Sequence, residues 1–286
     1  MSQSFDRPDV AIGQLNTLEV VRQRDVGVFL DGGQFGSILL PRRYVPENCQ
    51  DGDKLEVFVH LDSEDALIAT TDTPKVMVGQ IACLEVISTG PIGAFLDWGL
   101  PKDLLLPFGE QRHPAEEGER YLVRAYLDNT NRIAASTKLD KHLDLPQVSF
   151  RRHQKVQLLI AERTPLGCKA VVDQVAWGLI HTQDLFRDLK YGQSINGFIK
   201  QVRPDGKIDL LLEEPGYSPV TGLAAQIIEQ LKRDDGFLPL NDRSSADQIQ
   251  AHFGVSKKKF KMAIGSLYKQ RLIELQEDGI RLQAEN

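Results

Sequence analysis

The 286-residue sequence has no apolar run that approaches the roughly 18 residues needed to span a bilayer. Its first ten residues, MSQSFDRPDV, contain neither a basic nor an apolar segment, so they do not predict a signal peptide. Hydrophobic residues make up 41% of the chain and charged residues 26%, which is typical of a soluble globular protein. We therefore expect a cytoplasmic protein with no membrane partner.

Cysteine is scarce as well. Cys49, Cys83 and Cys168 lie far apart in the sequence and form no CxxC pair, which argues against a disulfide framework and against a zinc site. We expect all three to be reduced thiols. The six histidines show no HExxH or other metal-ligand spacing, so we expect neither a metal nor a cofactor.

Motifs for catalysis are also missing. The sequence has no Gly-x-Ser-x-Gly elbow and no Cys/His pair in a recognisable frame. Residues 192–197, GQSING, have the glycine spacing of a P-loop, but Phe198 stands where that motif requires lysine. We predict that the protein is not an enzyme. A nuclease site assembled from distant carboxylates is the catalytic alternative that the sequence leaves open.

The net charge of −6 is unevenly distributed along the chain. Residues 1–149 carry a net charge of −9, residues 150–214 carry +2 and residues 215–286 carry +1. Any charge that faces phosphate is therefore local, and we expect it in the C-terminal half.

Three copies of one module are indicated by repeated spacings. Gly27, Gly93 and Gly167 are separated by 66 and then 74 residues. The same two separations relate three further sets of residues: Gly52, Gly118 and Gly192; Leu39, Leu105 and Leu179; Leu40, Leu106 and Ile180. Four sets with one pair of offsets predict a tandem repeat.

Each copy contains about five short segments that are β-branched or alternating and are bounded by Gly, Asp and Pro. Five strands in roughly 70 residues favour a small closed barrel of the OB type. The predicted fold is therefore mostly β with a C-terminal α+β domain: three tandem OB-fold, five-stranded barrels followed by a winged helix-turn-helix. The expected domains are residues 8–73, 74–146, 147–214 and 219–286.

The second copy reads GAFLDWG, LLLPF, EGERYLVRAYL and IAASTK, and in this order it resembles the S1 RNA-binding domain. The third copy keeps WGLIH, the segment that in this family ends in a histidine. The resemblance implies that the barrels bind RNA.

Alternation along a strand assigns each side chain to a face. In copy one, Val26, Val28 and Leu30 are expected to point inward, which leaves Gly27, Phe29 and Asp31 outward. In copy two, Ile92, Ala94 and Leu96 point inward and Gly93, Phe95 and Asp97 point outward. Phe29 and Phe95 thus predict a platform for stacking unpaired bases, beside a glycine that lets the nucleic-acid backbone approach, and Trp98 is a candidate extension of it. The alternative is that these rings cap the barrel or pack on a neighbouring module.

The third copy departs from this pattern. Its alternation places Leu166, Cys168 and Ala170 inside, and Gly167, Lys169, Val171 and Asp173 outside. Lys169 therefore replaces the aromatic ring and offers a charge to phosphate. We predict that this module binds nucleic acid weakly, or through another surface that includes His181, Lys200 and Arg203. His181 has an alternative structural role as a hydrogen-bond donor.

After a linker marked by Pro215, Gly216 and Pro219, the hydrophobic period changes from 2 to 3.6. Leu223, Ile227, Ile228 and Leu231 form one helical stripe. Ser244 is the predicted N-cap of a second helix, residues 246–253, with Asp247 as its capping partner. Gly254 is predicted to end that helix and Ser256 to cap the third, and LIEL and GIRLQ form the wing.

The third helix is predicted to bury Phe260, Ala263, Ile264 and Leu267. Its outer face carries Lys258, Met262, Gly265 and Lys269, with Lys257 and Lys261 beside them. These lysines are candidates for phosphate contact, since the helix occupies the recognition position of a helix-turn-helix. The alternative is an ordinary solvated face.

The segment SKKKFKMAIGSLYKQRLIEL after three S1-like modules resembles the conserved virulence factor B family of bacterial proteins. The resemblance implies RNA binding and a role in post-transcriptional regulation. We expect a monomer that binds single-stranded RNA. The alternatives are a DNA-binding transcription regulator and a scaffold on the ribosome or RNA polymerase.

Overall fold

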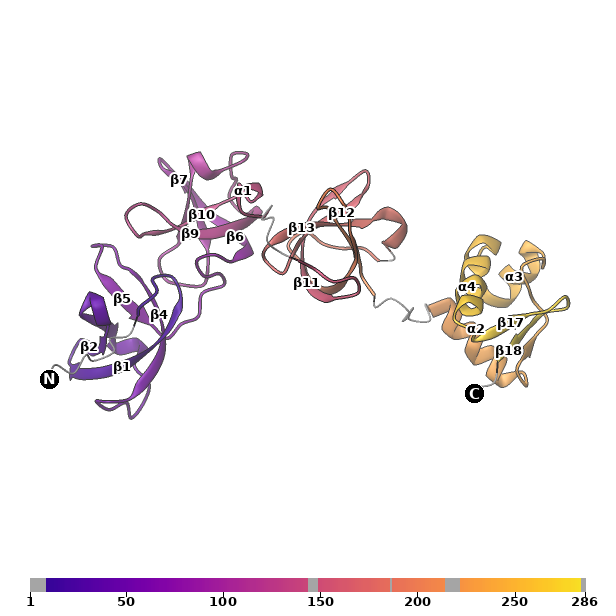
Figure 1. Cartoon of the computed structure of the whole chain (residues 1–286), viewed down its shortest axis with the longest axis horizontal. Helices are drawn as coiled ribbons and strands as arrows, with labels where there is room; N and C mark the ends of the chain where they lie inside the picture. Colours follow the sequence, from indigo (N-terminus) through magenta and orange to yellow (C-terminus); the bar gives the residue numbers. More distant parts are fainter. Residues whose placement is uncertain (1–8, 144–148, 186, 214–221, 284–286) are drawn as a thin grey trace. The chain divides into compact units, whose positions relative to one another are not determined.

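In the computed structural model of the chain, residues 9–143, 149–185, 187–213 and 222–283 are described (Figure 1). They form three closed five-stranded barrels, followed by helices and a small sheet. The predicted fold class is therefore confirmed. The predicted linker residues Pro215, Gly216 and Pro219 lie outside the described residues. No described helix has the length and apolar content that crossing a membrane requires.

All three barrels connect their strands in the same cyclic order, 1-2-3-5-4. The first consists of β1 (Leu15–Arg24), β2 (Gly27–Asp31), β3 (Ser37–Pro41), β4 (Lys54–Leu61) and β5 (Leu67–Thr70). The second consists of β6 (Ile81–Gly90), β7 (Gly93–Asp97), β8 (Leu104–Pro107), β9 (Arg120–Leu127) and β10 (Ile133–Ser136). The third consists of β11 (Lys155–Thr164), β12 (Gly167–Val172), β13 (Ala176–His181), β14 (Ser194–Val202) and β15 (Ile208–Leu211).

Short helices join these strands. The single-turn 3-10 helices are η1 (Gly33–Phe35), η2 (Arg42–Tyr44), η3 (Phe108–Glu110) and η4 (Thr182–Asp184). The α-helix α1 (Asp140–Leu143) follows the second barrel. In the first barrel the predicted inward residues Val28 and Leu30 are fully buried, as are Ile38 and Leu40 on the neighbouring strand. In the first barrel, alternation therefore identified Val28 and Leu30 correctly as core residues.

The second strand of each barrel begins with a glycine because no larger residue fits at that position. A Cβ at Gly27, Gly93 or Gly167 would lie 2.1, 2.2 or 2.0 Å from a backbone carbonyl oxygen of the paired third strand. The φ angles of these glycines are 149°, 154° and 150°, which L-residues rarely adopt. The prediction that these glycines open the surface to a nucleic-acid backbone is therefore wrong, because the space they leave is filled by the barrel itself.

The residue before each of these glycines was also predicted incorrectly. Val26, Ile92 and Leu166 were expected to point inward, but they are 60%, 56% and 68% exposed. Each lies in the turn before the second strand, where the two-residue period of a strand no longer applies. The three barrels thus present an apolar side chain at the same hairpin turn.

The chain divides into two compact units. One contains the first two barrels with residues 156–195 and 204–207 of the third, and the other contains the remaining residues of the third barrel and the C-terminal domain. Within the first unit, Gln174 accepts a hydrogen bond from the Ile81 N–H at 2.5 Å, and the Tyr191 hydroxyl accepts one from the Leu122 N–H at 2.7 Å.

An apolar cluster accompanies these bonds. Val171 was predicted to face outward from the third barrel, but it is buried against Leu122 and Leu139 of the preceding module. The prediction failed because alternation describes one isolated barrel, whereas this side chain is covered by a second one. The outer side of β12 is therefore partly used for contact within the chain.

The C-terminal domain contains α2 (Gly222–Arg233), β16 (Phe237–Leu238), α3 (Ala246–Phe253), α4 (Lys257–Lys269), β17 (Ile273–Leu275) and β18 (Ile280–Leu282). Figure 1 shows the helices gathered beside β17 and β18 at the yellow end of the chain. The four residues predicted to be buried on α4 are all buried. Strand β16 was not predicted, since two residues are too short to show a period.

The caps of α3 differ from the prediction by one residue. Ser245, not Ser244, is the N-cap, and Gln248, not Asp247, completes the capping box. The Ser244 hydroxyl instead accepts a hydrogen bond from the Asn241 N–H. The other two predictions are confirmed: Gly254 ends α3 in the left-handed conformation, and Ser256 caps α4.

Candidate nucleic-acid interface

We call the residue that occupies the place of Phe29 in each barrel the platform position: Phe29, Phe95 and Lys169. In the first barrel the Phe29 ring is half-buried on β2 and faces away from the core. The Arg22 guanidinium, from the paired residue of β1, lies 4.3 Å from the ring centroid. This barrel therefore combines a half-buried aromatic ring with a cation, although its overall charge is acidic.

The second barrel has the same ring but different neighbours. Phe95 is half-buried, and Ser88 occupies the place that Arg22 has in the first barrel. Beside it, Lys75 lies 2.5 Å from Asp97, and its hydrogen bond lowers the pKa of that carboxyl. Phe108 on η3 is 57% exposed, and its N–H donates to the Ile92 carbonyl. The barrel thus exposes a second aromatic ring, just after the end of β8.

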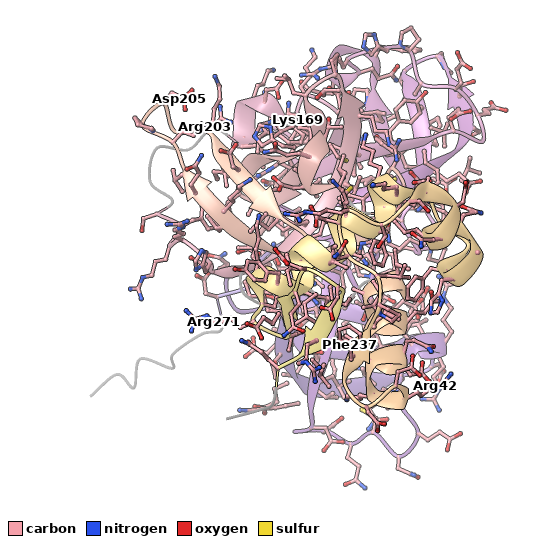
Figure 2. All side chains as sticks on the ribbon, turned by 90° about the vertical axis from the view of Figure 1, so that its right-hand side faces the viewer. Arg42, Lys169, Arg203, Asp205, Phe237 and Arg271 are labelled. Carbon is pink, nitrogen blue, oxygen red and sulfur yellow. The ribbon has the colours of Figure 1, made fainter. Side chains whose placement is uncertain are left out.

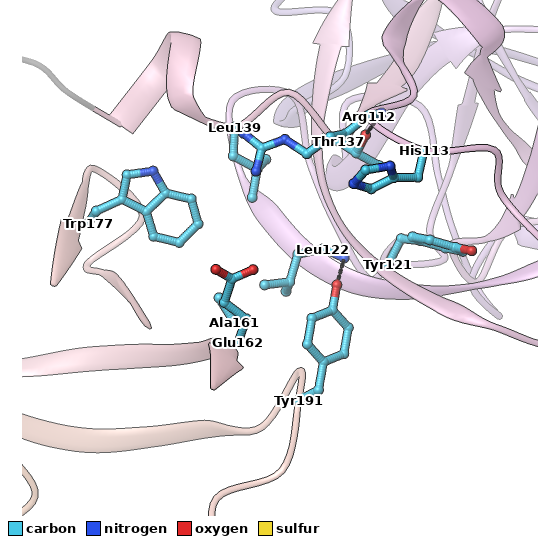
Figure 3. Close-up of a pocket in the computed structure, with 10 residues that line it drawn as sticks. All are labelled: Arg112, His113, Tyr121, Leu122, Thr137, Leu139, Ala161, Glu162, Trp177 and Tyr191. Carbon is cyan, nitrogen blue, oxygen red and sulfur yellow. Dashed lines mark hydrogen bonds between the residues drawn. The ribbon is translucent and has the colours of Figure 1, made fainter. Parts of the chain in front are cut away.

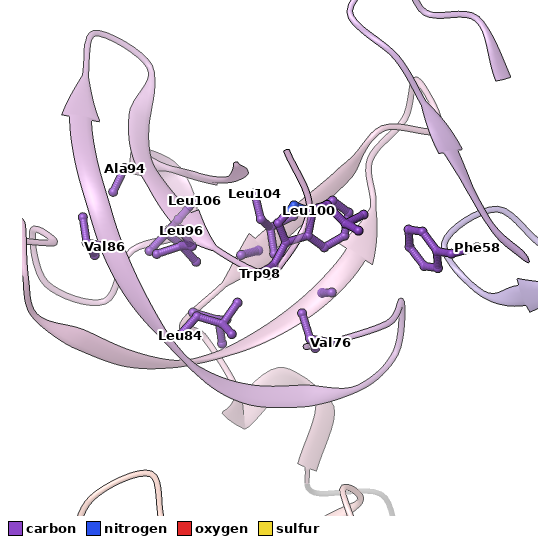
Figure 4. Packing of buried hydrophobic residues seen from close by; sticks show 13 residues of the cluster. Phe58, Val76, Leu84, Val86, Ala94, Leu96, Trp98, Leu100, Leu104 and Leu106 are labelled. Carbon is purple, nitrogen blue, oxygen red and sulfur yellow. The ribbon is translucent and has the colours of Figure 1, made fainter. Parts of the chain in front are cut away.

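Trp98 does not extend the platform. It is only 4% exposed, and its indole packs edge-on against Phe58 with ring centroids 5.7 Å apart (Figure 4). Its Nε1–H donates to the Lys102 carbonyl at 2.5 Å, so the polar edge is also satisfied inside the protein. The prediction of a nucleic-acid contact at Trp98 is therefore wrong, because the chain leaves β7 there and turns the ring into the core.

The third barrel holds its platform residue in a network. Lys169 Nζ lies 3.8 Å from the centroid of the Trp177 ring and 3.8 Å from Asp140 Oδ1. The same carboxylate accepts a hydrogen bond from Trp177 Nε1 at 2.9 Å and is paired with Arg112. Lys169 is therefore not an open charge for phosphate, since a carboxylate and an aromatic face already surround it.

The other predicted residues of the third barrel lie on different strands. His181 ends β13 and Lys200 lies on β14, and both are half-buried. Arg203, which Figure 2 labels, binds the buried Asp209 carboxylate through two nitrogens at 2.9 and 2.8 Å. A bidentate pair with a buried carboxylate gives Arg203 a structural role.

The outer face of α4 carries the cations that the sequence predicts. Lys258, Lys261 and Lys269 are exposed, and α4 contains no acidic residue. Lys261 lies 3.9 Å from Asp242, and the Lys257 ammonium lies 3.4 Å from the Arg243 carbonyl. Met262 stands among them with 65% exposure. The face is therefore cationic with an apolar centre.

Sequence reasoning missed three residues of these surfaces: Arg22, Phe108 and Trp177. Alignment of the copies gives no signal for Arg22 or Phe108, because the other copies have different residues at these positions: Ser88 and Glu162 for Arg22, and Arg42 and Thr182 for Phe108. The contacts of Trp177 with Asp140 depend on how two modules pack, which no local pattern records.

No group of three or more His, Cys, Asp or Glu among the described residues could hold a metal ion. The three cysteines are free thiols, and burial raises the pKa of Cys83 and Cys168. Raised values keep these thiols protonated, which makes them weak nucleophiles.

Comparison with known proteins adds the family context. A family model for the S1 domain matches residues 12–72 and 78–138, and one described as the CvfB-like winged helix domain matches residues 225–282. The Bacillus subtilis protein YitL is 28% identical over 93% of this chain and 92% of its own length. Conserved virulence factor B of Staphylococcus epidermidis is 25% identical over 95% of this chain and 94% of its own length. A crystal structure of a multidomain protein with nucleic acid binding domains from Streptococcus pneumoniae is 22% identical over 95% of this chain and 98% of its own, with a TM-score of 0.41.

Proposed function

This chain belongs to the conserved virulence factor B family, and from that membership we propose that it binds single-stranded RNA without catalysing a reaction on it. The S1 and winged-helix domains support nucleic-acid binding in general. Beyond nucleic-acid binding, we propose that the chain prefers RNA and acts in post-transcriptional regulation. An alternative function is a scaffold that docks on the ribosome or RNA polymerase through its acidic N-terminal half.

One observation carries the proposal. Phe29 and Phe95 occupy the same position in two barrels, and each ring is half-buried, so part of each ring is exposed to solvent. The Arg22 guanidinium lies over the Phe29 ring and would have to move aside for a base or stack with it. Such rings stack on unpaired bases, and each stacked base contributes about 1–3 kcal/mol with little dependence on sequence. A duplex keeps its bases stacked on one another, and the platforms therefore favour a single strand.

The DNA-binding alternative depends on α4. Readout of bases in a major groove normally uses Arg, Asn or Gln, but the outer face of α4 presents Lys258, Met262 and Gly265. This composition supports contact with phosphates, which is not sequence-specific.

A competition experiment separates the two functions. A labelled oligouridylate bound to the full chain is displaced at fixed salt with unlabelled oligouridylate or with duplex DNA of equal phosphate content. We expect the RNA strand to compete at least about fivefold better, which is the advantage that one stacked base provides at about 1 kcal/mol. Stronger competition by the duplex would instead support a DNA-binding regulator. Binding that does not weaken as salt is raised would support the scaffold.

Gly265 provides a prediction for α4. A Cβ at this position would meet no atom within 4 Å, so packing does not require glycine in the middle of the helix. Gly265→Ala should therefore stabilise the domain by about 0.5–1 kcal/mol, because alanine has the higher helix propensity. If a phosphate backbone lies against this face, the same methyl group should weaken RNA binding several-fold.

The paired measurements are thermal unfolding and RNA affinity of the same variant. Gln226→Ala on the exposed side of α2 is the control, since it also raises helix propensity but lies on another helix. If the Gly265→Ala protein is more stable but its RNA affinity is unchanged, α4 is not part of the proposed interface.

A further inference from the structure

A cavity of about 150 Å³ lies between the second barrel and the strands β11 and β13, within one compact unit (Figure 3). Its apolar floor is formed by Leu122, Leu139 and Ala161. Three aromatic rings, two potential cations, one carboxylate and one hydroxyl complete the lining: Tyr121, Trp177, Tyr191, Arg112, His113, Glu162 and Thr137. An enclosed cavity of this volume holds one benzene ring. This one is partly open to solvent, so a flat base larger than benzene can insert one edge while the rest of it stays outside.

The cavity occupies the face that carries the platforms in the other barrels. Glu162 pairs with Lys169 across β11 and β12, as Arg22 pairs with Phe29 in the first barrel. The same β-bulge precedes both residues, between Val20 and Arg22 and between Ile160 and Glu162. In the third barrel, therefore, an acid takes the place of the arginine.

The walls are held in place by bonds between the modules. The Tyr191 hydroxyl accepts the Leu122 N–H at 2.7 Å, and the Trp177 indole is fixed by Asp140 at 2.9 Å and by the Lys169 ammonium over its ring. Burial raises the pKa of Tyr191, which keeps its hydroxyl neutral. A planar guest would thus meet positioned aromatic and apolar groups, so little entropy would be lost in ordering the site.

The carboxylate of Glu162 points into the cavity beside Trp177 and Leu122 (Figure 3). An ionised carboxylate only accepts hydrogen bonds, through two adjacent oxygens. Among the RNA bases, guanine alone presents two adjacent N–H donors on its Watson–Crick edge. In uracil a carbonyl oxygen flanks the single donor on each side, and in cytosine and adenine an acceptor nitrogen lies next to the amino group.

We propose that this cavity binds one guanine base of a single RNA strand, with Glu162 accepting both donors of its Watson–Crick edge. Arg112, which is paired with Asp140, and His113 also line the cavity and give it positive charge near the adjoining phosphates. The proposal rests on RNA binding as the proposed function and adds a base preference to it. The platforms of the first two barrels stack on any base, so the third barrel would supply the selectivity.

The test uses the full chain and two hexanucleotides, hexauridylate and the same strand with one internal guanosine. The chain has two tryptophans, of which Trp98 is buried in the core, so a change in fluorescence on binding reports Trp177. The guanosine strand should bind about tenfold more tightly than hexauridylate, since a good bidentate contact to a base is worth about 1–3 kcal/mol. It should also quench the fluorescence more strongly at saturation.

Glu162→Gln should reduce the preference for guanosine to twofold or less, because the amide replaces one acceptor with a donor. Glu56→Gln, an exposed acid on β4, removes the same charge elsewhere and should keep the full preference. Equal affinity for the two strands, or an unchanged preference in Glu162→Gln, would overturn the guanine site and leave RNA binding standing. Failure of both strands to bind would overturn RNA binding itself.

Discussion

Gly93→Ala is expected to destabilise the second barrel by about 3 kcal/mol or more. Two independent costs add at this residue. The φ angle of 154° is unfavourable for any residue with a Cβ, and the added methyl carbon would lie 2.2 Å from the Leu106 carbonyl oxygen. Relief requires β7 and β8 to separate, which would break the hydrogen bonds that close the barrel. Thermal and urea unfolding of the full chain would show the loss as an earlier or separate transition.

Gly109→Ala is the matched control in the same barrel. Gly109 lies in η3, and a Cβ there would meet no atom within 4 Å. This variant should unfold within about 0.5 kcal/mol of the unchanged protein. If Gly93→Ala were equally harmless, the repeated glycines could not be explained by close pairing of the second and third strands.

The fold was largely predictable because its main signals are local and repeated. Four sets of residues at the same offsets identified three modules, and alternation inside each strand identified core residues such as Val28 and Leu96. The repeated glycine at the start of the second strand then marks where that strand pairs closely with the third, because no side chain fits there. Sequence patterns of this kind are strong wherever one residue type satisfies a single steric requirement.

The interface was predicted less well because its residues depend on contacts that are distant in the sequence. Alternation cannot tell that Trp98 turns inward after β7 or that a neighbouring module covers Val171. The sequence predicts that Lys169 is a free charge, because it does not show that Asp140 and Trp177 lie beside it. Charge summed over a segment was also misleading, since the acidic first barrel places Arg22 directly over its platform ring.

The N-cap of α3 was predicted one residue too early. Ser244 and Ser245 are adjacent and chemically identical, so the choice between them depends on which backbone N–H groups lie within reach. The structure places Gln248, rather than Asp247, three residues after the cap. Local sequence gave the correct helix here but not its first residue.

The second large effect concerns RNA affinity. The variant that combines Phe29→Ala and Phe95→Ala is expected to bind oligouridylate at least about thirtyfold more weakly, because two stacked bases would be lost at about 1 kcal/mol or more each. Both rings are only half-buried, so the barrels should remain folded. The matched control combines Phe29→Tyr and Phe95→Tyr, which retains two aromatic rings and should retain most of the affinity.

The affinity of the double alanine variant for oligouridylate, measured beside its thermal unfolding and beside the double tyrosine control, tests the central claim most directly. The account predicts a loss of at least about thirtyfold with a folded protein, and recovery of binding when tyrosine is present. Unchanged affinity in a folded double alanine variant would contradict the claim that the first two barrels bind RNA by stacking.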